Sequence, residues 1–110
     1  MKVAVIGSRN LSIDLEKYIP EDTTEIISGG AMGIDTLAEL YATSKKLPIK
    51  IYKPEYERYG KAAPIIRNKL IVDDADMVLA IWDGHSKGTK YSIDYAKKQG
   101  KSIKVVIPQY

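Results

Sequence analysis

Three short segments of this sequence combine glycine with hydroxyl-bearing and charged side chains, as loops that bind phosphate do. They are Gly7-Ser8-Arg9, residues 28–35 (Ser-Gly-Gly-Ala-Met-Gly-Ile-Asp) and residues 83–89 (Asp-Gly-His-Ser-Lys-Gly-Thr). Glycine lets the backbone take positive φ and lets a ligand approach closely. Each segment leads into residues that we expect to be helical, and the first N–H groups of a helix lack internal partners and carry partial positive charge. Phosphate is the natural ligand of such a position.

From these segments, and from two polar residues within a predicted helix, we predict a binding site for a phosphate-bearing ligand. The candidate residues are Gly7, Ser8, Arg9, Ser28, Gly29, Gly30, Gly33, Asp35, Arg67, Asn68, Asp83, Ser86, Gly88 and Thr89. Backbone N–H groups of the candidates between 28 and 33 would hold the phosphate, and those between 86 and 89 would hold the same phosphate or a ribose from the opposite wall. Arg9 and Arg67 would supply positive charge. If the ligand is a nucleotide, Asp35 and Asp83 would bind its ribose hydroxyls.

Several of these residues also have structural explanations. A glycine pair after a strand serves ordinary tight turns, and Arg9 can be a solvated surface side chain. Asp35 lies in the first turn of a predicted helix, where an acid is favourable in any case. Arg67 and Asn68 can face solvent from their helix. The lone histidine, His85, fits a solvated loop position, with a catalytic role as the alternative.

Alternating strands and helices must position these loops. Short apolar runs predict strands at residues 3–6, 24–28, 49–52, 77–82 and 103–107. Apolar residues at helical spacing predict helices between them, and residues 54–60 are predicted to form a polar loop. The first helix carries Leu15, Tyr18 and Ile19 and stops at Pro20, the second begins at Ile34, the third starts at Pro64 and carries Ile66 and Leu70 inward, and the fourth is capped by Thr89 and ends at Gly100.

This alternation predicts one α/β domain over residues 1–110, a Rossmann-like three-layer αβα fold with a parallel sheet of about five strands. Ligands of such sheets bind outside the carboxyl ends of the strands, where the strand order reverses. We expect the order 3-2-1-4-5, which makes the second, first and fourth strands neighbours and brings the three loops to one crevice. The order 2-1-3-4-5 would separate the first and fourth strands and scatter the loops.

Composition excludes several classes of protein. The 110 residues contain no cysteine and one histidine, which excludes disulfide scaffolds, thiolate metal sites and histidine-rich centres. We expect no metal and no cofactor. No apolar run approaches the roughly 18 residues of a membrane span, and no signal pattern precedes the first strand, so we expect a cytoplasmic protein with no membrane partner. The net charge of +3, concentrated in residues 84–110, leaves single-stranded nucleic acid as a less favoured partner.

The order and spacing of these segments resemble those of the SLOG superfamily, which includes the DNA-processing protein DprA (Smf) and the Lonely Guy enzymes. The resemblance rests mainly on residues 6–9, 28–35, 67–68 and 82–89, and is closest to the small stand-alone bacterial and phage members related to YspA and YpsA. It implies a Rossmann-like fold that binds a nucleotide or nucleotide-derived ligand, as a sensor or in nucleotide processing, and a homodimer or larger assembly. It also implies that residues 28–35 are the phosphate loop, that Ser86, Gly88 and Thr89 form a second loop, and that Arg67 is the arginine of the third helix.

Two further functions follow from the resemblance as alternatives. Lonely Guy enzymes cleave the N-glycosidic bond of nucleotides, so a phosphoribohydrolase-like hydrolase or transferase is one alternative, with Asp35, Asp83 and Arg67 as candidate catalytic residues. The glutamates that follow the glycine-threonine motif of those enzymes are replaced here by Lys90-Tyr91-Ser92. The carboxylate that such chemistry needs is therefore absent from its expected place. A DprA-like single-stranded DNA-binding protein is the other alternative.

Overall fold

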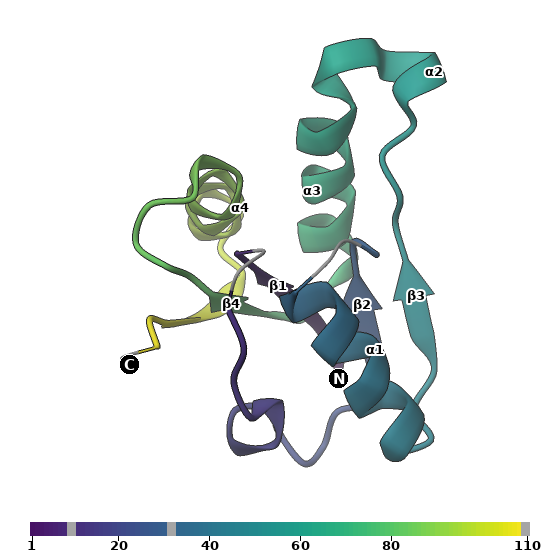
Figure 1. The fold of residues 1–110 in the computed structure, drawn as a ribbon, viewed down its shortest axis with the longest axis vertical. Coiled ribbons are helices and arrows are strands. Elements are labelled where there is room, and N and C mark those ends of the chain that lie inside the picture. The colour runs from purple at the N-terminus through teal and green to yellow at the C-terminus, as the bar shows by residue number, and fades with distance from the viewer. Residues whose placement is uncertain (9–10, 31–32, 109–110) are drawn as a thin grey trace.

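Five parallel strands form one sheet in the computed structural model of the protein, which describes residues 1–8, 11–30 and 33–108 (Figure 1). The strands are β1 (Lys2–Gly7), β2 (Glu25–Ser28), β3 (Ile49–Ile51), β4 (Met77–Ile81) and β5 (Ser102–Val106). Their order is β3-β2-β1-β4-β5, which confirms the predicted order and places β1 between β2 and β4. The carboxyl ends of these three strands therefore lie side by side.

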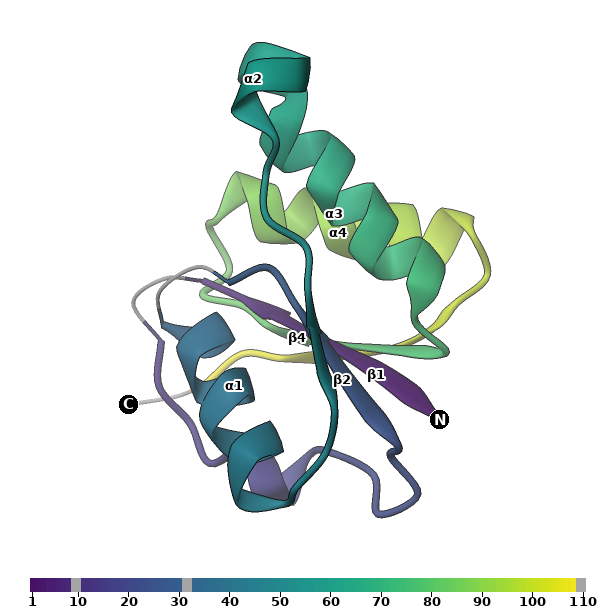
Figure 2. The ribbon, with the colours of Figure 1, turned by 90° about the vertical axis from the view of Figure 1, so that its right-hand side faces the viewer.

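Helices cover both faces of the sheet, so the fold has the three layers that the sequence predicts (Figure 2). The helix α1 (Ile34–Ser44) and a 3-10 turn, η1 (Leu15–Lys17), lie on one face, whereas α3 (Ala63–Asp74) and α4 (Lys87–Lys98) lie on the other. The short helix α2 (Tyr56–Tyr59) and a second 3-10 turn, η2 (Gly60–Ala62), extend beyond the sheet at the start of α3. In the described parts of the chain, no helix combines the length and apolar character needed to cross a membrane.

The central strands are buried on both faces. Residues 3–5 of β1 and 78–81 of β4 are 0% exposed. Alternate residues belong to two apolar clusters, one against α1 and η1 and the other against α3 and α4, because successive side chains of a strand point to opposite faces. Burial on both faces explains why these strands are continuous apolar runs rather than alternating patterns.

The helix predicted around Leu15 and Ile19 is reduced to the turn η1. Asp14 precedes this turn with extended backbone, and its carboxylate accepts a hydrogen bond from the N–H two residues later at 3.2 Å. Leu15 and Ile19 are nevertheless buried, as predicted. A segment this short, closed by Pro20, forms too few helical hydrogen bonds to offset the cost of nucleation.

The helix α3 is rotated relative to the prediction, which carried Ile66 and Leu70 inward; Ile66 is half-buried. Leu70 is 47% exposed, whereas Ile71 is 1% exposed and packs in the cluster under α3 and α4. Ala63 is also buried, and Arg67 lies midway between Ala63 and Ile71. Residues four apart share one face of a helix, so Arg67 lies on the buried side. The small side chain of Ala63 lets this face, rather than the one with Leu70, approach the sheet.

Two smaller differences concern the ends of elements. The helix α4 begins at Lys87 with Ser86 as its N-cap residue, so Thr89 is not the cap. Residues 56–59, predicted as loop, form α2. Because α4 starts earlier than predicted, Gly88 and Thr89 lie in its first turn, beyond the carboxyl end of β4, and not in the preceding loop.

Candidate functional site

A cavity of about 480 Å³, the main cavity, opens where the carboxyl ends of the central strands meet the segments that follow them. Residues from all three predicted loops line it, together with residues of α3. The predicted site residues in its wall are Gly7, Ser8, Gly29, Asp35, Arg67, Asn68, Asp83, Ser86, Gly88 and Thr89. Ser28, Gly30 and Gly33 are not among its lining residues, and Arg9 lies outside the described residues.

The side chain of Arg67 forms part of this wall and is held by backbone oxygens. Its Nη1 donates to the carbonyl oxygen of Gly29 at 2.9 Å and to that of Tyr52 at 3.4 Å. Its Nε donates to Asn68 Oδ1 at 2.8 Å. Arg67 therefore ties the loop after β2 to the segment after β3, and its guanidinium has a fixed position beside the cavity.

Two glycines in the wall are required by close contacts. A Cβ at Gly29 would lie 2.7 Å from Arg67 Nη1 and 3.1 Å from Asp35 Oδ2. A Cβ at Gly7 would lie 2.6 Å from Ile34 Cγ1. Gly29 thus lets Arg67 and Asp35 both approach the loop, and Gly7 lets the first residue of α1 pack on the end of β1. Asp35 itself is 8% exposed.

Ser28, Gly30 and Gly33 of the segment at 28–35 shape the loop from outside the cavity. The side chain of Ser28 is fully buried, and its Oγ accepts a hydrogen bond from the Gly30 N–H at 3.4 Å. Gly30 and Gly33 have φ values of +70° and +76°, a backbone conformation that favours glycine. In the described part of the motif, Gly29 is the glycine that reaches the cavity.

The loop after β4 folds around the carboxylate of Asp83. Oδ1 accepts hydrogen bonds from the N–H groups of Ser86 at 2.7 Å and His85 at 2.8 Å, and Oδ2 accepts one from the Ser86 hydroxyl at 2.9 Å. The backbone N–H groups of Ser86 and His85 are the main reason that the pKa of Asp83 is lowered to about 2, because they stabilise the ionised form. At neutral pH this carboxylate is negative and holds the loop together.

Ser8 connects the loop after β1 to the loop after β4. Its N–H donates to the carbonyl oxygen of Ile81 at 3.0 Å, and its Oγ accepts a hydrogen bond from the Asp83 N–H at 3.2 Å. The same Oγ lies 3.0 Å from Ser86 Oγ. Trp82 Nε1 also donates to the carbonyl oxygen of Ser86 at 3.0 Å. These contacts fix the two loops relative to each other.

The first turn of α4 supplies a second positive element of the wall. Lys87, Gly88 and Thr89 line the cavity. The Lys90 N–H donates to the carbonyl oxygen of Ser86, which begins the helical pattern, so the preceding N–H groups have no carbonyl within the helix to bind. The turn contains no acidic residue and two lysines. Its partial positive charge is therefore not neutralised from within the turn.

The structure adds residues to the wall that the sequence analysis did not select. They are Ile6, Pro64, Ile71, Lys87 and Ser92. Lys87 lies within the predicted loop at residues 83–89. A cation next to a glycine at the start of a helix could have been recognised from the sequence as a phosphate-binding residue. Ser92 lies one helical turn after Thr89, and its Oγ donates to the carbonyl oxygen of Gly88 at 3.2 Å. Pro64 and Ile71 could be found only once the rotation of α3 was known.

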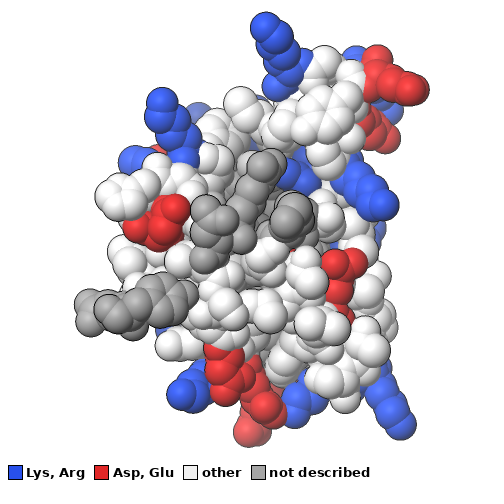
Figure 3. All heavy atoms as spheres, viewed as in Figure 1, with Lys and Arg blue, Asp and Glu red and all other residues white. Residues whose placement is uncertain are grey.

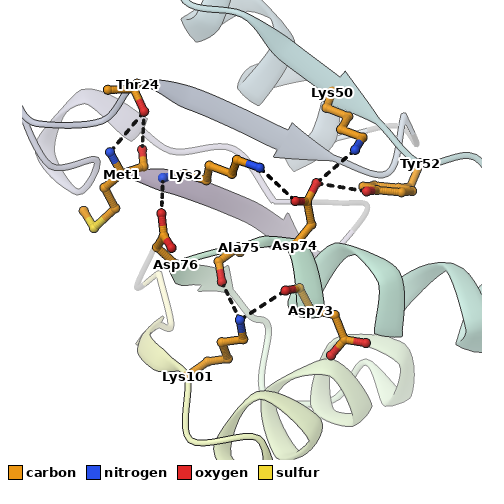
Figure 4. Close-up of polar contacts among 10 residues, drawn as sticks. All are labelled: Met1, Lys2, Thr24, Lys50, Tyr52, Asp73, Asp74, Ala75, Asp76 and Lys101. Atoms are coloured by element: carbon orange, nitrogen blue, oxygen red, sulfur yellow. Dashed lines mark hydrogen bonds and ion pairs between the residues drawn. The ribbon is translucent and has the colours of Figure 1, made fainter.

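A network of polar contacts fixes the other end of α3 (Figure 4). Asp74 accepts hydrogen bonds from Lys2 Nζ at 3.1 Å and from the Tyr52 hydroxyl at 2.9 Å, and Lys50 Nζ lies 3.3 Å from its Oδ2. Burial alone would raise the pKa of Asp74, but the hydrogen bonds from these three side chains outweigh burial and lower it. Tyr52 contacts α3 twice, through its hydroxyl at Asp74 and its carbonyl oxygen at Arg67.

A second cavity, of about 590 Å³, lies between α3 and the segment that leads from β3 to α2. It is lined by Lys53, Arg58 and Tyr59 among others, and Arg67 belongs to both cavities. Arg58 Nη1 lies 3.8 Å from Glu55 Oε2.

Figure 3 shows Lys and Arg side chains around the rim of one face, with Asp and Glu between them. The charges of the described residues on that face are therefore mixed rather than gathered in one basic patch.

Comparison of this chain with protein-family models, with curated proteins and with solved structures gave no match. Over residues 1–8, 11–30 and 33–108, no group of three or more His, Cys, Asp and Glu side chains is placed to hold a metal ion. What the main cavity offers a ligand is a set of backbone N–H groups, hydroxyls, the cations Arg67 and Lys87, and the carboxylates Asp35 and Asp83.

Proposed function

We propose that the main cavity binds a nucleotide or nucleotide-derived small molecule through its phosphate group, in a SLOG-type domain that serves as a sensor or in nucleotide processing. The observation that carries this proposal is that two positive elements, the first turn of α4 and the guanidinium of Arg67, line the same cavity. Helix N-termini attract phosphate, and guanidinium groups form strong hydrogen bonds to it. The resemblance of residues 28–35 and 82–89 to the SLOG superfamily supports the same class of ligand.

The size and order of the cavity also support a small-molecule ligand. Its volume of about 480 Å³ lies within the roughly 300–1,000 Å³ of typical ligand pockets. The wall combines apolar side chains such as Ile6 and Ile71 with the polar groups described above. The hydrogen bonds around Asp83 and Arg67 hold that wall in shape before any ligand arrives, which reduces the entropy lost on binding.

A thermal-shift and calorimetric screen tests this proposal. The panel consists of inorganic phosphate, nucleoside mono- and diphosphates, dinucleotides and unphosphorylated nucleosides. A ligand present at 100 times its Kd should add about 2.7 kcal/mol to the free energy of unfolding. We expect phosphorylated compounds to stabilise the protein and nucleosides to do so much less. If no phosphorylated compound shifts the melting temperature, the proposal is wrong.

A matched pair of lysine variants locates the phosphate. Lys87→Gln removes a charge from the cavity wall, and Lys98→Gln removes the same charge from the last turn of the same helix. We expect Lys87→Gln to weaken phosphate binding by about 3- to 10-fold, as the loss of one partly exposed charge contact does, and Lys98→Gln to leave it near the wild-type value. Equal effects of the two variants would indicate a diffuse electrostatic attraction instead of a site at α4.

Cleavage of an N-glycosidic bond is a second candidate function. The observation that favours it is that the nearly buried carboxylate of Asp35 lines the same cavity as Arg67. The Asp83 carboxylate is ionised at neutral pH and its oxygens bind its own loop, which does not suit a general acid. Chromatographic detection of free base from a nucleotide panel tests the activity. We expect Asp35→Asn to abolish base release; release that persists in Asp35→Asn would remove this residue from the reaction.

Single-stranded nucleic acid is a third candidate, and the second cavity is the feature that favours it. Lys53, Arg58 and Tyr59 combine positive charge with an aromatic ring, and Arg67 joins them to the main cavity. Aromatic stacking in a basic groove is how proteins bind single strands without sequence preference. A mobility-shift assay in a salt series tests this, because neutralised phosphates make affinity fall steeply with salt. Absence of binding at low salt would exclude it.

A further inference from the structure

The hydroxyl of Ser86 lies between two other polar groups at the wall of the main cavity. Ser86 Oγ is 2.9 Å from Asp83 Oδ2 and 3.0 Å from Ser8 Oγ. Both neighbours are within hydrogen-bond distance, but a serine hydroxyl carries one proton and can donate only once. Which neighbour receives that proton decides what Ser86 can offer to a ligand.

The proton of Ser86 is directed to Asp83. An ionised carboxylate can only accept hydrogen bonds, and the pKa of about 2, set chiefly by the N–H groups of Ser86 and His85, keeps Asp83 ionised at neutral pH. Ser86 Oγ and Asp83 Oδ2 are 2.9 Å apart, and without a proton between them their lone pairs would repel each other. The Ser86 hydroxyl therefore donates to Asp83 Oδ2.

Ser8 continues this chain of hydrogen bonds on the other side of Ser86. Its Oγ already accepts the Asp83 N–H at 3.2 Å, and Ser86 has no second proton to give. The Ser8 hydroxyl also helps to lower the pKa of Asp83, so the Ser8 proton is shared between that carboxylate and Ser86 Oγ, which lies 3.0 Å from Ser8 Oγ. Ser8 is 3% exposed, whereas Ser86 is half-buried, so Ser86 is the more accessible of the two hydroxyls. One lone pair of Ser86 Oγ remains for a ligand in the cavity that this residue lines.

The two sides of the cavity thus have opposite hydrogen-bonding character. The backbone N–H groups in the first turn of α4 and the guanidinium of Arg67 can only donate, which suits phosphate oxygens. Ser86 Oγ, with its proton directed to Asp83, can only accept from a ligand. An ionised phosphate oxygen is an acceptor too and is disfavoured there, whereas a sugar hydroxyl can donate.

We propose that Ser86 Oγ accepts a hydrogen bond from a ribose hydroxyl of the bound ligand, with Asp83 and Ser8 as positioning residues. The cavity then prefers a ribosyl phosphate to a phosphate group alone. This inference rests on the proposed function, because it requires that the phosphate is held by α4 and Arg67.

The test compares two probes, inorganic phosphate and ribose 5-phosphate, by NMR titration of backbone amides, which measures weak binding. One net hydrogen bond corresponds to about a 3- to 10-fold gain in affinity, so the wild-type protein should bind ribose 5-phosphate that much more tightly than phosphate. In Ser86→Ala, which removes the acceptor, the ratio of the two affinities should fall to about one. Ser44→Ala is the control, because Ser44 Oγ bonds only locally to the carbonyl oxygen of Tyr41 on α1, and its ratio should equal that of the wild type.

Asp83→Asn provides a second variant that keeps the shape of the loop. The Asn oxygen can still accept the N–H groups of His85 and Ser86, while its NH₂ group takes the place of Oδ2 and donates to Ser86 Oγ. The Ser86 proton is then no longer held by residue 83, so the hydroxyl can donate to a phosphate oxygen as well as to a ribose hydroxyl, and the ratio should again fall toward one. A merely structural role of Asp83 would weaken both probes together and leave the ratio unchanged.

The outcomes separate this inference from the proposed function. If phosphate binds but ribose 5-phosphate binds no more tightly, or if Ser86→Ala and Asp83→Asn both keep the wild-type ratio, the inference is wrong and the phosphate site stands. If neither probe perturbs the amides around the cavity, the proposed function fails and the inference fails with it. Should Ser86→Ala lose its folded spectrum, the Asp83→Asn ratio decides.

Discussion

Arg67 Nη1 donates a hydrogen bond to the carbonyl oxygen of Gly29 at 2.9 Å, across a separation of 38 residues in the sequence. The cation on α3 and the glycine-rich loop after β2 therefore position each other. Gly29 makes this contact with no side chain in the way, and the space beside it is already taken by the Arg67 guanidinium and the Asp35 carboxylate.

Gly29→Ala should destabilise the fold and weaken phosphate binding. The new Cβ would lie 2.7 Å from Arg67 Nη1 and 3.1 Å from Asp35 Oδ2, so Arg67 must move and lose its bond to the loop. Overpacking of this kind costs about 1–3 kcal/mol, which urea denaturation can measure. A variant as stable as the wild type would show that the Arg67 contact contributes nothing to the fold.

Gly88→Ala is the matched substitution and should have the opposite effect on stability. A Cβ at Gly88 meets nothing within 4 Å, and alanine in place of a helical glycine stabilises by up to about 1 kcal/mol. The methyl group would nevertheless stand beside the N–H groups of the first turn of α4 and should weaken phosphate binding several-fold. Thermal melts and a phosphate titration measure the two effects. Raised stability with unchanged affinity would place the phosphate elsewhere.

The ion pairs of Asp74 should make stability depend on pH in the acid range. The hydrogen bonds from Lys2, Tyr52 and Lys50 outweigh burial and lower the folded-state pKa below the ordinary value of 3.8. The stabilisation is therefore fully present above pH 3.8 and is lost as pH falls through the folded-state pKa. Because both lysines are about half exposed, we expect Asp74→Asn to cost about 1–2 kcal/mol at pH 7.

The control for this prediction is Asp94→Asn. Asp94 pairs with Lys90 four residues earlier on α4, and both side chains are more than half exposed, so the loss should be about 0.3–0.5 kcal/mol. Urea denaturation at pH 7 and at pH 2 gives the comparison. The difference between wild type and Asp74→Asn should shrink toward zero at the lower pH, and a constant difference would contradict the assignment to the ionised carboxylate.

The rotation of α3 can be tested with two neighbouring residues of equal size. Ile71 is 1% exposed and Leu70 is 47% exposed. Ile71→Ala should cost about 2–5 kcal/mol, as truncation of a buried residue does, whereas Leu70→Ala should cost about 1 kcal/mol or less. The free energies of unfolding decide between the two faces. The reverse order would show that Leu70, and not Ile71, packs against the sheet.

The architecture was predictable because its signals are local and strong. Residues 3–6 and 77–82 are apolar runs of strand length, and glycines follow both. Once the strand order is given, the three loops must converge, since they follow neighbouring strands. Ser86 and Gly88 reach the cavity for this reason, although the sequence alone did not place the start of α4 at Lys87.

The interactions within the site were not predictable, because they depend on helix rotation and side-chain geometry. Leu70 and Ile71 are both apolar, so the sequence pattern allowed either to face the sheet, and only the correct rotation brings Arg67 to Gly29. The sequence predicts that Asp83 binds ribose, and Asp83 does line the cavity, but the hydrogen bonds of its carboxylate within its own loop were not predicted. A short polar side chain in a turn serves both purposes, and spacing does not distinguish them.

The carboxylate of Asp83 should titrate far below an ordinary aspartate, with a midpoint near pH 2. The N–H groups of Ser86 and His85 are the main cause of this low pKa, and the Ser86 hydroxyl adds a smaller effect. The folded-state pKa lies below the ordinary 3.8, so the loop hydrogen bonds are fully formed above pH 3.8 and are lost as pH falls through about 2. Carbon-detected NMR of the side-chain carboxyl gives the midpoint, and the amide signals of His85 and Ser86 should change with it. In Ser86→Ala, which keeps both backbone N–H groups, the midpoint should rise only part of the way toward 3.8. A wild-type midpoint near 3.8 would show that the N–H groups of Ser86 and His85 do not stabilise the ionised carboxylate.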